Sequence, residues 1–169
     1  MDIVDRDSNL ENLLAETGKI MWKCRGVSMK PLVRLGRDLI VIERPGMPLE
    51  KYDIALYRKE RLRDASKREY ILHRVIDVED DRYIILGDNC VNLEYVPKEA
   101  VVGKMTARVR GGKEQRLEGF PYTLYMNLWI KPWRFRVAVL KGRNKAHRFA
   151  SKTLPRPAKD KMKRVLHKA

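Results

Sequence analysis

Short strands separated by tight turns between residues 37 and 110 constrain the fold more than any other feature of the chain. β-Branched and aromatic residues gather in short runs, and Gly, Pro, Asp and Asn stand between the runs. Almost no helical pattern interrupts this series, as it would in a βαβ fold. The sequence therefore predicts a mainly β fold, a curled antiparallel sheet or small barrel. The expected strands are residues 39–42, 52–57, 70–76, 83–86 and 100–109, with an extended segment at 19–24.

Helical patterns occur only toward the two ends of the chain. Asp7 or Ser8 can cap a short N-terminal helix that ends at Gly18. From Phe120 the apolar spacing is again helical, but Pro132 must kink or restart that helix. The predicted divisions are a helix and strand lead-in at 1–23, a β domain at 24–110, an amphipathic aromatic and basic segment at 111–145, and a basic, disordered tail at 146–169.

Positive charge is concentrated in the last two fifths of the chain. The formal net charge is +15, yet residues 1–103 carry 18 basic and 19 acidic side chains. Residues 104–169 carry 19 basic and 3 acidic side chains, a net charge of +16. The excess charge therefore belongs to the C-terminal segment and not to the β domain.

Three interpretations of the aromatic and basic segment remain open. Residues 120–148 could lie on an anionic membrane surface, with apolar side chains on one side and Lys and Arg toward the headgroups. The same composition could bind nucleic acid through charge and stacking. The segment could also be a helix packed on the β domain and followed by a solvated tail. We favour the membrane surface and do not expect a nucleic-acid partner.

Cysteine content and the N-terminus bear on the compartment. Two cysteines, Cys24 and Cys90, make neither a disulfide framework nor a metal-ligand cluster, and a reducing compartment is the simpler interpretation. The first residues are acidic, and no 18-residue apolar span follows. We expect a cytoplasmic protein, peripheral on the inner membrane face, without a metal or other cofactor.

One serine stands in a setting that suits a nucleophile. Ser28 precedes Met29, and Pro31 follows three positions after the serine. Residues 36–38 then form a Gly-x-Asp turn ahead of an apolar run. A serine presented on a bend before a strand fits nucleophilic catalysis, although the same order also fits a plain loop.

Three further residues could complete a catalytic site around Ser28. His73 is the only histidine in the first 140 residues and lies inside an apolar strand. Its ordinary pKa of about 6.5 suits a general base, although a lone strand histidine is also commonly a packed residue. Asp88 either closes a Gly-Asp-Asn turn or orients the imidazole, and Glu94 is the weaker alternative for the orienting role.

Six short motifs in this order resemble the signal peptidase I superfamily, which includes the self-cleaving phage and SOS repressors. The motifs are a nucleophile box at 26–31 that starts at Gly26, a Gly-Arg-Asp strand start at 36–41, a strand at 52–56 with Tyr52 in place of the usual glycine, the base-bearing strand at 72–76, the Gly-Asp-Asn box at 86–89, and the closing strand at 102–104. The resemblance covers about residues 24–109. It implies the curled β fold of that superfamily and a peptidase activity.

Histidine at position 73, where most bacterial members carry lysine, resembles the endoplasmic-reticulum and archaeal type with its Ser-His-Asp arrangement. The resemblance implies that Ser28 attacks the scissile carbonyl while His73 takes its proton, with Asp88 holding the ring. The backbone N–H of Ser28 would donate to the oxyanion. That type often has a second acid six positions after the Gly-Asp-Asn aspartate, and here the position is Glu94.

Two departures from the family limit what can be transferred. The family's signal peptidases have a transmembrane anchor ahead of the serine, and here the preceding residues are polar. The repressors need a DNA-binding domain and an upstream scissile bond such as Ala-Gly, and neither is present in the sequence. We therefore expect a serine endopeptidase that cleaves a separate peptide or protein substrate. The alternatives are a catalytically idle peptide-binding or regulatory module of the same fold and a basic nucleic-acid-binding protein.

Overall fold

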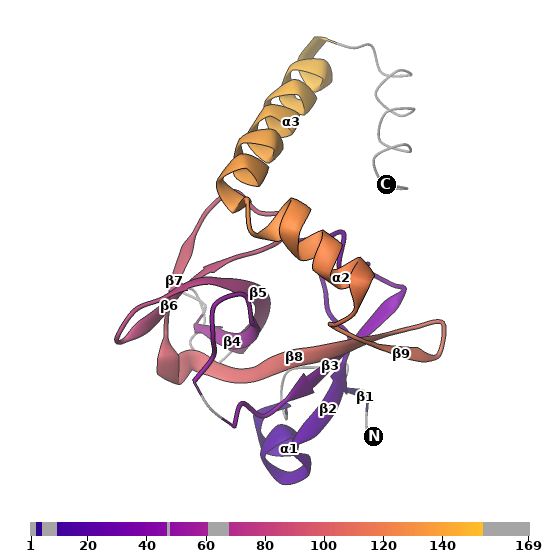
Figure 1. Ribbon diagram of the computed structural model, residues 1–169, viewed down its shortest axis with the longest axis vertical. Coiled ribbons are helices and arrows are strands. Elements are labelled where there is room, and N and C mark those ends of the chain that lie inside the picture. The colour runs from indigo at the N-terminus through magenta and orange to yellow at the C-terminus, as the bar shows by residue number, and fades with distance from the viewer. Residues whose placement is uncertain (1–2, 5–9, 47, 61–67, 154–169) are drawn as a thin grey trace.

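Nine strands pair into one curled sheet, which the computed structural model describes together with helices at both ends (Figure 1). The described residues are 3–4, 10–46, 48–60 and 68–153. The strands are β1 Ile3–Val4, β2 Lys19–Trp22, β3 Asp38–Glu43, β4 Ile54–Glu60, β5 Arg68–Val78, β6 Arg82–Leu86, β7 Glu94–Pro97, β8 Val101–Arg110 and β9 Lys113–Arg116. Their order is β1-β2-β3-β8-β4-β5-β6-β7, and β9 pairs with β8. Every pair except β1 with β2 is antiparallel, which confirms the predicted mainly β, curled antiparallel fold.

The long strand β8 joins the two halves of the sheet, because it pairs with both β3 and β4. A first buried cluster fills the space among α1 (Leu10–Thr17), β2, β3 and β8, and includes Ile42 and Met105. A second cluster gathers between β4, β5, β6 and β7, and includes Tyr57 and Val75. Side chains on a strand alternate between its faces, so neighbours on β5 contribute to opposite sides of the sheet.

The N-terminal helix follows its predicted pattern over the described residues. Leu10 and Leu14 on α1 are buried, and Gly18 ends the helix with a φ of 70°. The Gly18 N–H donates to the Leu14 carbonyl at 2.9 Å. The expected caps, Asp7 and Ser8, lie outside the described residues.

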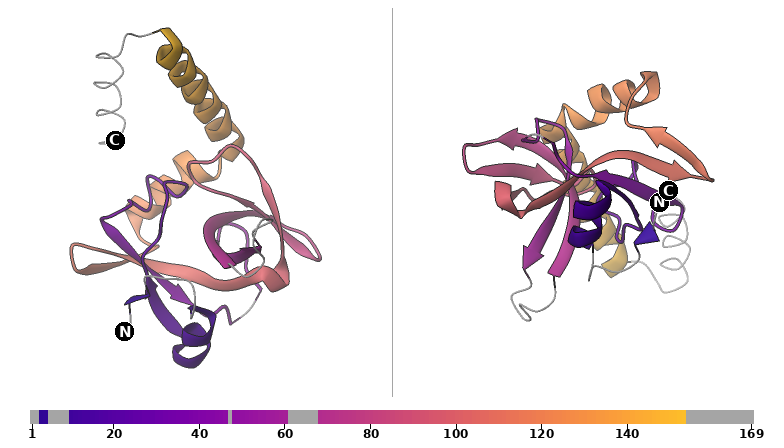
Figure 2. Two further views of the ribbon diagram at one scale, coloured as in Figure 1. Left: turned by 180° about the vertical axis from the view of Figure 1, so that it is seen from behind. Right: turned by 90° about the horizontal axis from the view of Figure 1, so that it is seen from below.

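The C-terminal segment is more helical than the sequence predicted. The first helix, α2 (Phe120–Tyr125), runs into a π-helix, η3 (Met126–Ile130), and α3 (Trp133–Thr153) starts after Pro132 as expected. The prediction of a disordered tail from residue 146 is wrong for 146–153, which continue α3, and 154–169 lie outside the described residues. Figures 1 and 2 show α2 crossing the sheet and α3 projecting away from it.

Two further differences concern the connections between strands. The strands expected at 52–57 and 70–76 are longer in the structure, because β4 and β5 both extend into the charged stretch between them, of which residues 61–67 lie outside the described chain. A β9 strand, unforeseen from the sequence, forms a hairpin with β8 around Gly111 and Gly112, which have φ values of 57° and 76°.

Gly103 on β8 leaves no space for a side chain, and this close approach can be tested. A Cβ there would fall on Ile42 Cγ2 and lie 3.1 Å from Leu14 Cδ2. We expect Gly103→Ala to lower the free energy of unfolding by about 1–3 kcal/mol, because the core must shift to admit the methyl group. Urea denaturation measures the change.

Gly142→Ala is the matched control, since Gly142 is exposed on α3 with no atom within 4 Å of an added Cβ. That change should stabilise the helix by about 0.5–1 kcal/mol. Equal stability of Gly103→Ala and the wild type would contradict the close packing of β8.

Candidate functional site

The bend that carries Ser28 is held from two sides. Asn89 donates from its backbone N–H to the Ser28 carbonyl at 2.7 Å and from Nδ2 to the Val27 carbonyl at 3.1 Å. Met29 of the nucleophile box is buried in the first cluster and anchors the bend to the core. Gly26 opens the bend with a φ of 89°, a conformation that favours glycine. Ser28 itself stays half-exposed.

Ser28, His73 and Cys90 all approach Gly87 closely. A Cβ on Gly87 would lie 2.9 Å from the Ser28 carbonyl oxygen, 3.0 Å from His73 Cδ2 and 2.7 Å from Cys90 Sγ. Only glycine therefore allows this approach of the serine bend, the β5 strand and the turn after β6. No hydrogen bond joins Ser28 Oγ to His73 within the described residues.

His73 is oriented through its Nδ1 atom. Glu94 Oε1 lies 3.2 Å from Nδ1, and the Tyr57 hydroxyl lies 3.4 Å from the same atom. Lys59 holds the other oxygen of the Glu94 carboxylate at 2.7 Å. The Cδ2 edge of the ring faces Cys90 and the serine bend. This leaves Nε2 as the nitrogen for proton transfer.

The Glu94–His73 pair is ionised at neutral pH. Burial favours the neutral ring, but Cys90 and Glu94 outweigh burial and raise the pKa of His73 to about 9. The hydrogen bond from His73, together with Lys59, outweighs burial and lowers the pKa of Glu94 to about 2. In the resting protein the ring is therefore an imidazolium that faces a carboxylate.

Asp88 does not face His73. Its fully buried carboxylate accepts two hydrogen bonds from Arg74, Nε to Oδ1 at 2.9 Å and Nη2 to Oδ2 at 2.8 Å. Tyr125 donates to Oδ2 at 2.7 Å, and Arg136 Nη1 lies 3.8 Å from Oδ1. Because His73 and Arg74 point to opposite faces of β5, the aspartate that meets Arg74 cannot also hold the imidazole. The geometry gives the orienting role to Glu94.

The C-terminal helices pack on this part of the domain. Trp129 Nε1 donates to the Asp88 carbonyl at 3.3 Å, and Arg143 Nη2 donates to Asn89 Oδ1 at 3.1 Å. Ile130 of η3 and Leu140 of α3 are also buried. One face of the aromatic and basic segment therefore packs on the β domain, as one of the three interpretations held. The opposite face is exposed.

Cys90 is a site residue that sequence reasoning missed. It lies two positions after Asp88, and only the turn after β6 brings its thiol to the His73 ring. Cys24 is different, because burial raises the pKa of its thiol to about 11 and keeps it protonated. The turn spacing in Gly-Asp-Asn-Cys was the one available signal for Cys90.

The backbone N–H of Ser28 is free to act as an oxyanion donor, since it donates to no acceptor within the described part of the chain. The remaining box residue, Pro31, lines a pocket whose walls include neither Ser28 nor His73. Among residues 3–4, 10–46, 48–60 and 68–153, no cluster of His, Cys, Asp and Glu could hold a metal ion. No helix in these ranges is long and apolar enough to cross a membrane.

Comparison of the chain with protein-family models, with curated proteins and with solved structures finds no match.

The Glu94–His73 pair predicts how stability depends on pH. The folded pKa of His73 lies above its ordinary value of 6.5, so its contribution is complete below pH 6.5 and is lost as pH rises through about 9. We expect the deprotonation of His73 to lower the free energy of unfolding of the wild type by at most about 3 kcal/mol over this window. Urea midpoints between pH 6 and about 9.5 measure the fall.

Glu94→Gln should flatten this pH dependence, because the amide no longer stabilises the imidazolium. Glu99→Gln, at an exposed glutamate, is the control and should keep the wild-type slope. The same slope in Glu94→Gln and Glu99→Gln would show that Glu94 does not hold the charged ring.

Proposed function

We propose that the protein is a serine endopeptidase in which Ser28 is the nucleophile, His73 the base and Glu94 the orienting acid. The observation that carries the proposal is the convergence at Gly87, where the Ser28 carbonyl and the His73 ring lie within 3.0 Å of one point. Glu94 sits on the other ring nitrogen, as the third member of a triad does. The resemblance to the histidine type of the signal peptidase I superfamily supports a peptide or protein as substrate.

The proposed reaction is acyl transfer through an ester on Ser28. Ser28 Oγ attacks the scissile carbonyl carbon while His73 Nε2 takes its proton, and His73 then protonates the leaving amine. Water hydrolyses the acyl-enzyme by the reverse order of proton transfers. The Ser28 N–H donates to the oxyanion, and Glu94 stabilises the imidazolium that forms. Asp88 supports the site indirectly through Asn89, which holds the Ser28 carbonyl.

The pH dependence of this reaction follows from the state of His73. Only the neutral ring can accept the Ser28 proton, and the pKa of His73 is about 9 in the resting protein. Acylation of Ser28 should therefore rise as pH increases toward about 9.

A second candidate nucleophile is Cys90, which faces the same ring. A thiol beside an imidazole ring, with Glu94 on the far nitrogen, is the arrangement of a cysteine nucleophile. In such a reaction the protonated ring is the productive partner, so reactivity would not require a neutral His73. An idle peptide-binding module would bind substrate without reacting at either residue.

We also propose that the enzyme works in the cytoplasm and at the inner membrane face. The C-terminal helices support the membrane contact, because they expose large apolar side chains, among them Leu128 at 67% and Phe135 at 69%.

Covalent labelling separates these candidates. A fluorophosphonate probe should label the wild type and Cys90→Ala but not Ser28→Ala, with a rate that rises from pH 7 to about 9. At a pH above about 9, where the ring is neutral in both proteins, Glu94→Gln should slow labelling by about 10²–10⁴-fold, because the ring loses its orienting partner. Mass spectrometry of the labelled peptide identifies the residue.

The opposite pattern would favour Cys90. Fast alkylation of Cys90 by iodoacetamide at pH 7, together with fluorophosphonate labelling that survives in Ser28→Ala, would remove Ser28 as the nucleophile. Labelling of neither residue by either reagent would favour the idle binding module.

A further inference from the structure

An arginine-lined pocket lies beside the serine bend. Its volume is about 490 Å³, and its walls come from residues 31–34, the β8–β9 hairpin and α2. The lining includes Arg34, Arg108, Arg110, Arg116, Tyr122 and Tyr125. One acidic residue, the exposed Glu118, also stands in the lining. Such a volume accommodates a phosphate headgroup. We call these six residues the arginine pocket.

The arginine pocket carries more positive charge than the acidic residues beside it neutralise. Asp38 pairs with Arg110, at 2.7 Å to Oδ1 and 2.6 Å to Oδ2. Arg108 donates only to neutral acceptors, the Leu32 carbonyl and Gln115 Oε1. Within the described ranges, no carboxylate pairs with Arg34, Arg108 or Arg116.

Electrostatics inside the arginine pocket favour an incoming anion. Burial, together with the charges of Arg110 and Arg34, lowers the pKa of Arg108. The positive charge of Arg108 is therefore only weakly stabilised by its surroundings. Arginine binds phosphate oxygens with two parallel N–H donors, so a phosphate would relieve this repulsion better than a point anion.

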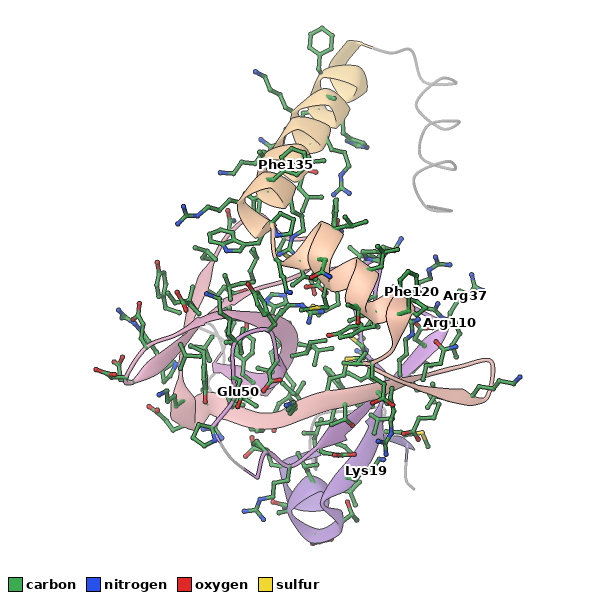
Figure 3. The ribbon with its side chains drawn as sticks, viewed as in Figure 1. Lys19, Arg37, Glu50, Arg110, Phe120 and Phe135 are labelled. Carbon is green, nitrogen blue, oxygen red and sulfur yellow. The ribbon has the colours of Figure 1, made fainter. Side chains whose placement is uncertain are left out.

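An exposed apolar row begins at the wall of the arginine pocket. Phe120, Leu124 and Leu128 are 79%, 46% and 67% exposed, and their spacing of four places them on one helical face. Figure 3 shows Phe120 on the same side of the molecule as Arg37 and Arg110. The opposite face of the helix is the one that packs on Asp88.

The composition of the neighbouring helices is complementary to an anionic membrane. Residues 119–153 contain eight Lys or Arg and no acidic residue. A soluble phosphate would occupy the arginine pocket alone and leave the apolar row exposed to water. A bilayer with anionic headgroups matches both features at once, since it offers phosphate at the surface and hydrocarbon below it.

We infer that the arginine pocket binds the phosphate of an anionic phospholipid while Phe120, Leu124 and Leu128 enter the interfacial layer of the same bilayer. The inference deepens the membrane part of the proposed function and is independent of the chemistry at Ser28. It assigns the arginine pocket as the headgroup site and the start of α2 as the insertion face. The serine bend would then lie close to the membrane surface.

Vesicle flotation tests the inference on the full chain. The protein should float with vesicles of phosphatidylcholine and phosphatidylglycerol and stay behind with phosphatidylcholine alone. Arg34→Gln with Arg116→Gln should lower the partition coefficient at least about tenfold, from the loss of two positive charges at the surface. Phe120→Ser with Leu124→Ser should have a similar effect, because apolar insertion is lost.

Two controls separate a defined site from diffuse attraction. Arg44→Gln with Lys98→Gln removes the same charge away from the arginine pocket and should lower partitioning less than about threefold. Tyr95→Ser removes an exposed aromatic from β7 and should change nothing. Near-wild-type thermal midpoints for all variants show that each protein is folded.

Three results would overturn the inference. Equal losses in the two charge variants would mean that overall basicity carries the binding. Full competition by inorganic phosphate at constant ionic strength, with no effect of Phe120→Ser and Leu124→Ser, would indicate a soluble phosphate site. If the wild type does not float, the protein does not bind anionic membranes and the inference is wrong. Ser28→Ala should float like the wild type, because membrane binding does not need the nucleophile. The peptidase proposal is tested separately, by covalent labelling of Ser28.

Discussion

The buried ion pair between Arg74 and Asp88 is the interaction on which the rest of the structure depends. Both side chains are fully buried, and two parallel hydrogen bonds join them. Removing one partner of such a pair leaves an uncompensated charge in the interior, which typically costs about 3–5 kcal/mol. The Tyr125 hydroxyl adds a third hydrogen bond to the carboxylate, so the pair also ties α2 to the sheet.

This pair places the candidate catalytic groups without touching substrate itself. Arg74 follows His73 on β5, so fixing the guanidinium on one face fixes the imidazole on the other. Asp88 precedes Asn89, whose N–H holds the Ser28 carbonyl. The C-terminal helices complete the support and are part of the folded domain. The basic appendage expected from the charge distribution is therefore, at its base, a structural element of the site.

Much of the fold could be predicted because it depends on local patterns. The strands follow β-branched runs, Pro132 separates the last two helical segments, and Asp38 closes the predicted turn by accepting from the Arg34 backbone N–H. β9 was missed because its residues, Lys-Glu-Gln-Arg, are all exposed and show no apolar alternation. Pairing with β8 forms that strand, and the Gly111-Gly112 turn was the one signal for the hairpin in the sequence.

The site could be predicted only in part, because its residues meet through the sheet. Ser28 and His73 stand out by residue type, and the structure brings the serine bend and β5 together at Gly87. The choice between Asp88 and Glu94 depends on the face to which each side chain points, and β6 and β7 set that face by their pairing. Tyr52 could not be foreseen in another respect, because its backbone has a φ of 78°, a conformation that favours glycine.

The ionisation of His73 is the most direct test of this arrangement. A titration of the His73 ring carbon resonances by NMR, with assignment from His73→Gln, measures its pKa in the folded protein. Pairing with Glu94 and Cys90 predicts a pKa near 9, and a lower value in Glu94→Gln. A pKa at or below 6.5 in the wild type would contradict the account, because it would mean that burial alone controls the ring and that no carboxylate orients it.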